Sequence, residues 1–303
     1  MRKLLLSSVL TVLCSWIAVP SVSGQTPPGP TTISTISYGN VAIPASVEIV
    51  QEVIDFAPGA RTPTQTRGGD LFVTLAEGEV VLRKGGSDVY YSVAARNRTF
   101  RVNKGEAYSL GNPSGAVKAR IYTSTVIAPG AALTTTAAGE PASPLPPVVV
   151  MTSKAASPPL PGVVTVVQVV WDFEPGAATP PHTHHGFFLV TVVDGELARK
   201  TVTGEKFYKA GEAFTEASGT EEDAIIRNAS AGRTRNFFTV LATQVPPSTT
   251  LPALPSSASG ITPPATGDAG LLGQDYALIP LAAVVVTVFG AAAVMMRQTK
   301  SRS

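Results

Sequence analysis

The chain has 303 residues, of which 44% are hydrophobic and 15% charged, and it contains 27 Gly and 26 Pro. This length accommodates about two ordinary domains, and so much Gly and Pro argues against a long helical bundle. The single cysteine, Cys14, lies near the start of the chain and excludes a disulfide framework or a Cys-ligated zinc site. Apart from Arg2, Lys3 and the bases after residue 296, acidic residues outnumber basic ones. Nucleic acid is therefore not expected as a partner.

Residues 1–24 have the three parts of a secretory signal peptide. Arg2 and Lys3 form a positive start, residues 4–18 are apolar, and small residues at 21–24 suit cleavage. The alternative is an N-terminal membrane anchor, for which the apolar run is short. We expect the following residues to be exported.

The middle of the chain contains a repeat. Residues 50–80 and 167–197 align without a gap at a constant offset of 117, with roughly half of the positions identical. Such agreement predicts two copies of one structural unit. Beyond it, Gly105-Glu106-Ala107-Tyr108 resembles Gly211-Glu212-Ala213-Phe214, with a longer insert in the first copy at residues 85–103.

The periodicity in both copies is that of β-strands. Short runs at 164–173, 188–193, 225–227 and 237–241 are rich in β-branched and aromatic residues and are bounded by Gly-containing pairs. Glu77-Gly78 and Asp194-Gly195 suggest hairpin turns. We predict an all-β protein with two tandem antiparallel barrels of the jelly-roll type, at residues 25–139 and 163–244. A Pro-rich connection at 140–162 joins them, with a short strand at 148–151.

The second copy carries a more specific pattern. Gly176 is followed after five residues by His182-Thr183-His184, and Gly195 lies eleven residues beyond His184. This resembles the first motif of the cupin family, and Gly211, Gly219 and Asn228 resemble the second motif loosely. The resemblance covers both copies and implies a bicupin.

The resemblance to cupins implies a metal site in the second copy. Cupins commonly bind one divalent transition metal through two His and one Glu of the first motif and one His of the second. His182 and His184 match the two His, whereas Phe188 takes the Glu position and Glu222 takes the last His position. The predicted ligands are therefore His182, His184 and Glu222, with Glu216 and Asp223 as further acidic choices.

The first copy lacks these ligands. Gln65, Arg67, Leu71 and Ala116 stand at the four equivalent places, so no metal is expected there. Arg67 is expected to bind an anion or to pair with Asp70, most simply as a solvated surface pair.

The C-terminal part resembles a membrane anchor. Residues 245–276 form a linker rich in Pro, Ser, Thr and Ala, residues 277–296 are apolar and long enough to cross a bilayer as a helix, and residues 297–303 are basic. Positive flanks stay in the cytoplasm, so both barrels are expected outside the cell membrane. Residues 263–267 resemble the sorting signal of sortase-anchored surface proteins, which suggests attachment to the cell wall near Thr266.

Two functions fit this layout. The first is a noncatalytic surface module that binds an unidentified small ligand or a metal in the second barrel. The second is an extracellular metal-dependent cupin enzyme of the oxygenase or isomerase type, and a passive spacer is a third reading. No catalytic residue and no organic cofactor site follow from the sequence.

Overall fold

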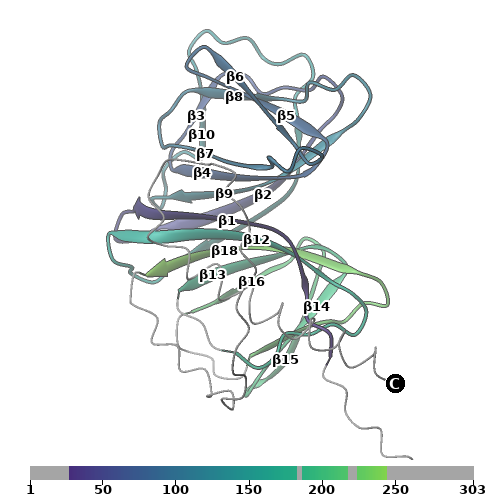
Figure 1. The fold of residues 1–303 in the computed structure, drawn as a ribbon. Helices are drawn as coiled ribbons and strands as arrows, with labels where there is room; N and C mark the ends of the chain where they lie inside the picture. The colour runs from purple at the N-terminus through teal and green to yellow at the C-terminus, as the bar shows by residue number, and fades with distance from the viewer. Residues whose placement is uncertain (1–26, 183–185, 218–223, 244–303) are drawn as a thin grey trace, which may run out of the picture.

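A computed structural model of the protein describes residues 27–182, 186–217 and 224–243 (Figure 1). This part of the chain consists of β-strands, turns and loops, as predicted. No helix within it is long and apolar enough to cross a membrane. The predicted signal peptide, linker, membrane span and basic tail lie outside the described residues and remain predictions.

Each copy of the repeat folds into two sheets that face each other across an apolar core. Barrel 1 comprises β2 (Glu48–Phe56), β3 (Gln65–Arg67), β4 (Asp70–Glu77), β5 (Glu79–Lys84), β6 (Ser87–Ser92), β7 (Thr99–Val102), β8 (Tyr108–Gly111), β9 (Ala119–Ile127) and β10 (Thr134–Thr136). Barrel 2 comprises β12 (Val163–Phe173), β13 (Phe187–Asp194), β14 (Glu196–Thr201), β15 (Gly204–Lys209), β16 (Ala213–Glu216), β17 (Ile225–Asn228) and β18 (Thr234–Thr243). The strands predicted in the second copy are confirmed.

The copies exchange one strand each. β1 (Thr31–Ala42) precedes barrel 1 in the sequence but pairs with β12 of barrel 2. β11 (Val148–Ala156), in the Pro-rich connection, pairs with β2 of barrel 1. The inner sheets therefore run β11-β2-β9-β4-β7 and β1-β12-β18-β13-β16. Figure 1 shows these two sheets stacked at the centre, with the outer sheets at opposite ends.

Side chains at matching positions confirm the duplication. Asp55 accepts two hydrogen bonds from Arg120 at 2.6 and 2.7 Å. Asp172 accepts two from Arg235 at the same distances. Both pairs join the second strand of an inner sheet to the third, so the two copies share their strand register.

Two local predictions are wrong. The turns at Gly78 and Gly195 do not make hairpins, because the strands that they join belong to different sheets. Both glycines have positive φ, and a Cβ at Gly78 would meet the carbonyl of Lys118. The second error concerns Tyr108 and Phe214, which are not equivalent. Phe214 lies opposite Val190, as Phe100 lies opposite Val73, so Phe100 is the true counterpart.

A buried polar network joins the inner sheets between the barrels. Gln51 donates to Thr239 at 2.8 Å and accepts from Thr191 at 2.6 Å. Its counterpart Gln168 donates to Ser124 at 2.7 Å and accepts from Thr74 at 2.6 Å. Ser124 and Thr239 hydrogen-bond to each other and complete an arrangement with approximate two-fold symmetry. The barrels are therefore held in one relative orientation by satisfied polar groups, with apolar clusters beside them.

Candidate functional site

The interior of barrel 2 contains a small cavity that both of its sheets line. Its lining residues are Trp171, His182, Phe188, Val190, Glu216, Ile226, Asn236 and Phe238. The volume is about 20 Å³, which is the room that one water molecule or one ion needs. In this conformation the cavity fits a very small ligand or a single ion.

His182 lines this cavity and precedes β13 in the sequence. It forms an isolated bridge with Ala224, and its Nδ1 lies 2.9 Å from the carbonyl oxygen of Pro180. Because a carbonyl can only accept, Nδ1 carries the proton of this hydrogen bond. In the neutral ring the lone pair is then on Nε2, and such a second hydrogen bond orients the imidazole of metal-binding histidines.

An ion pair crosses the barrel interior from one sheet to the other. Arg199 on β14 donates from Nε to Oε1 of Glu216 on β16 at 2.8 Å. The two side chains are only 10% and 2% exposed. The guanidinium carbon also lies 5.6 Å from the ring centre of Phe214. Burying two charges carries a large desolvation cost, which makes this pair weak evidence for a stabilising role.

Asn236 on β18 contributes an amide to the same cavity. The residue is 1% exposed, and in the described part of the chain neither its Oδ1 nor its Nδ2 has a hydrogen-bond partner. A buried amide without partners costs free energy, so an unpaired one needs an explanation such as a bound molecule. Asn236 therefore offers both a donor and an acceptor to an occupant.

The same places in barrel 1 are apolar. Strand register equates Arg199 with Leu82, Glu216 with Val102 and Asn236 with Ile121. All three barrel 1 residues belong to its buried hydrophobic core. Because the barrels share one fold, the fold does not require polar groups at these positions.

Barrel 1 instead buries polar groups around Arg67. Arg67 is 6% exposed and donates to Glu52 at 2.9 Å and to the Tyr108 hydroxyl at 3.0 Å. Gln65 donates to the same hydroxyl at 3.1 Å. The expected pairing with Asp70 in a solvated surface pair is wrong, because Asp70 accepts from Arg101 at 2.9 Å. The carboxylate of Glu52, which the repeat alone did not indicate, neutralises Arg67 inside the barrel.

Of the predicted metal ligands, only His182 falls within the described residues. His184, Glu222 and the further choice Asp223 lie outside them, so the predicted set stays a prediction. Among the described residues, no group of three or more His, Cys, Asp and Glu side chains is placed to hold a metal. His182 and Glu216 do line one cavity of ionic size. Imidazole and carboxylate are suitable ligands for a divalent transition metal, so these two residues fit such an ion.

Sequence reasoning missed Arg199 and Asn236. Neither belongs to a cupin motif, and an Arg or Asn in a strand is ordinarily taken as solvent-exposed. The available signal was the duplication, because the first copy has Leu82 and Ile121 at the same places. To match Asn236 with Ile121, however, the strands that follow the ungapped repeat must be aligned correctly between the two copies.

The comparison with solved structures identifies the fold. Vicilin from Solanum melongena has a TM-score of 0.50 at 10% identity over 65% of this chain and 74% of that chain. The fold is the cupin fold. Other similar structures are the oxalate decarboxylase of Lactobacillus farciminis (TM-score 0.47, 11% identity, 72% and 89% coverage) and a cupin 2 conserved barrel domain protein from Leptotrichia buccalis (TM-score 0.33, 13% identity, 70% and 90% coverage).

The sequence comparisons add no closer relative. No family model matches the chain, and no curated protein matches it. One fold can carry many different functions, so the cupin fold by itself does not decide between catalysis and binding. That decision depends on the residues inside barrel 2.

Proposed function

We propose that this protein is a surface-anchored bicupin whose second barrel is a noncatalytic binding module for a small ligand or a metal ion. The observation that carries the proposal is the contrast between Arg199, Glu216 and Asn236 and their apolar counterparts in barrel 1. Polar groups kept in a core at a cost to stability are typical of functional sites. Glu216 and Asn236 line a cavity that accommodates one small occupant, and Arg199 is paired with Glu216.

The metal-binding form of the proposal rests on His182 and Glu216, with His184 and Glu222 as the ligands that the cupin motif adds. A divalent transition metal held there would provide an open coordination position for a small ligand. Arg199 would orient the Glu216 carboxylate through its hydrogen bond, as partners of metal-binding carboxylates do. Asn236 would hydrogen-bond the occupant and limit its size.

The location is part of the proposal. A signal peptide at residues 1–24 and a membrane helix at 277–296 would place both barrels outside the cell membrane, with a linker as spacer. Cell-wall attachment near Thr266 is a further option for the same surface location. Protease added to intact cells is expected to remove both barrels, and their protection would contradict the proposed topology.

Metal analysis of the full-length protein, purified in detergent, tests the binding site. We expect near-stoichiometric divalent transition metal, lost in His182→Ala and retained in Gln65→Ala, the matched change in barrel 1. Metal should also raise the unfolding temperature of the parent and not that of His182→Ala.

Protein that contains no metal and takes up none on soaking would overturn the metal-binding form. It would also remove the alternative, an extracellular metal-dependent enzyme of the oxygenase or isomerase type, because that enzyme needs the same ion. The small-ligand form would then rest on Asn236 and on the contrast of the Arg199–Glu216 pair with the apolar core of barrel 1.

A further inference from the structure

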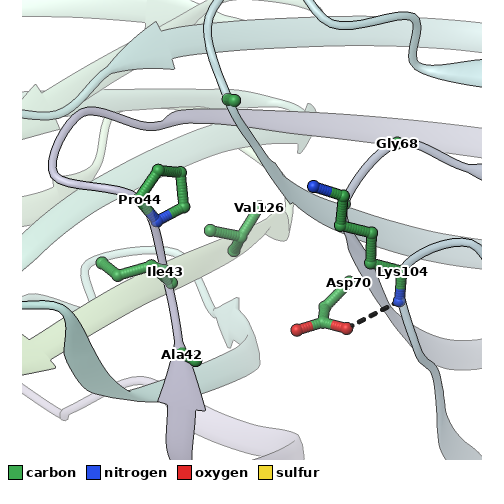
Figure 2. A pocket seen from close by; sticks show the side chains of 9 residues that line it. Ala42, Ile43, Pro44, Gly68, Asp70, Lys104 and Val126 are labelled. Carbon is green, nitrogen blue, oxygen red and sulfur yellow. Dashed lines mark hydrogen bonds between the residues drawn. The ribbon is translucent and has the colours of Figure 1, made fainter.

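A second cavity lies outside both barrel interiors, where the barrels meet. Its volume is about 210 Å³, roughly seven times the 30 Å³ that a water molecule occupies in the liquid. Ile43 and Pro44, which follow β1, form one side, and Asp70 and Lys104 form the other, with Val126 of β9 between them (Figure 2). Ligand sites are frequent at such junctions between domains.

The charged side of this cavity is organised. Asp70 accepts from the backbone N–H of Lys104 at 2.8 Å and from Arg101 at 2.9 Å, and its side chain is 14% exposed. Arg101 therefore neutralises Asp70. Lys104 lines the cavity, and its ammonium group makes no ion pair with any residue that the structure describes. The cavity thus has one surplus positive charge beside an apolar wall.

The second copy shows that the fold does not require this space. Strand register places Phe187 at the position of Asp70, and Leu241 at that of Val126. Phe187 is 5% exposed and packs in a buried cluster with Leu241 and, at its edge, Leu160. The side chain of Phe187 therefore occupies this position in barrel 2, whereas the smaller side chain of Asp70 leaves space at the same position in barrel 1.

We propose that this junction cavity binds a small monocarboxylate with a short, branched apolar body. The carboxylate pairs with the Lys104 ammonium group, and the apolar body lies against Ile43, Pro44 and Val126. An anion matches the surplus charge, and the apolar wall disfavours a small inorganic ion. The site does not depend on the function proposed for barrel 2.

Equilibrium dialysis of the full-length protein with labelled isovalerate tests this site, with detergent micelles alone as the blank. We expect saturable binding with a dissociation constant of about 1 mM, typical of so small a ligand. Isovaleramide, which has the same shape without the charge, should bind about fivefold more weakly. Added salt should weaken isovalerate binding and leave isovaleramide unaffected.

Two variants and one control complete the test. Lys104→Gln should weaken isovalerate binding about fivefold, and Ala128→Phe at the half-buried rim of the cavity should abolish it. Lys200→Gln removes a lysine from barrel 2 and should leave binding unchanged. Thermal melts of each variant separate lost binding from lost folding. Absence of saturable binding, or binding that survives Ala128→Phe in a folded protein, would overturn the proposal.

Discussion

Replacing Arg199 and Glu216 by Leu and Val, the residues at the same places in barrel 1, tests whether this buried ion pair stabilises the fold. Glu216→Val alone takes the carboxylate of the 2.8 Å pair away from a guanidinium side chain that is only 10% exposed. Removing one partner of a buried pair typically costs about 3–5 kcal/mol of unfolding free energy. Arg199→Leu alone is expected to cost a similar amount, because it leaves Glu216 buried without that cation.

The double variant Arg199→Leu/Glu216→Val should behave differently. It restores the Leu82 and Val102 chemistry that packs in the core of barrel 1. Replacing a buried ion pair by apolar residues of similar volume is often neutral or stabilising by about 1–4 kcal/mol. We therefore expect it to be at least as stable as the parent, with a coupling energy of several kcal/mol between the two sites.

Guanidinium unfolding of the parent, both single variants and the double variant measures this coupling directly. A loss of about 3 kcal/mol corresponds to a decrease in melting temperature of roughly 6–12 °C for a unit of this size. A Glu216→Val change that costs less than about 1 kcal/mol would contradict the reasoning. The reasoning would also be contradicted by a double variant with an unfolding free energy as low as that of the less stable single variant. That result would mean that the ion pair itself stabilises the fold.

Two further predictions concern the framework of the fold. Gln168→Leu removes the acceptor of Thr74 and one of the two partners of Ser124, which keeps Thr239. We expect a cost of about 1–3 kcal/mol in denaturant unfolding, because the Thr74 hydroxyl stays buried without its partner. A cost under about 0.5 kcal/mol would show that the network contributes little. The hydrogen bonds from Arg120 lower the pKa of Asp55 below its usual range. The stability that they contribute is therefore present above about pH 4 and lost as the pH falls through the lowered value. Asp55→Asn should cost about 1 kcal/mol of unfolding free energy at neutral pH, because the pair is partly exposed. The variant should also lose less stability than the parent as the pH falls. An unchanged acid slope would contradict this cause.

The sequence was sufficient for the repeat unit and its strands, because both signals are local. An ungapped match that includes Asp55 and Asp172 preserves strand register, and alternating apolar residues mark the strands. The exchange of β1 and β11 could not be predicted in this way. Local pattern does not say which copy an edge strand joins when both copies present equivalent edges.

The site was predictable only where a motif marks it. The cupin spacing indicated His182, and the structure places that residue at the barrel 2 cavity. Arg199 and Asn236 are isolated polar residues in strands, and their burial depends on sheets that close far apart in sequence. Loops of different length shift the alignment of the copies between β14 and β16, so comparing the copies by sequence motif matched Phe214 with Tyr108 instead of Phe100.

The polar groups around Arg67 in barrel 1 and the amide of Asn236 in barrel 2 differ in whether they have hydrogen-bond partners. In barrel 1, Arg67 is neutralised by Glu52 and bonded to Tyr108, and within the described residues none of the buried side-chain atoms of these three lacks a partner. Arg67 stands at the position equivalent to His184 of barrel 2, and its guanidinium carries a positive charge there that Glu52 neutralises. In barrel 2 the buried amide of Asn236 has no partner among the described residues. An occupant of the barrel 2 cavity could supply the missing partners of Asn236, which favours the second barrel as the place of binding.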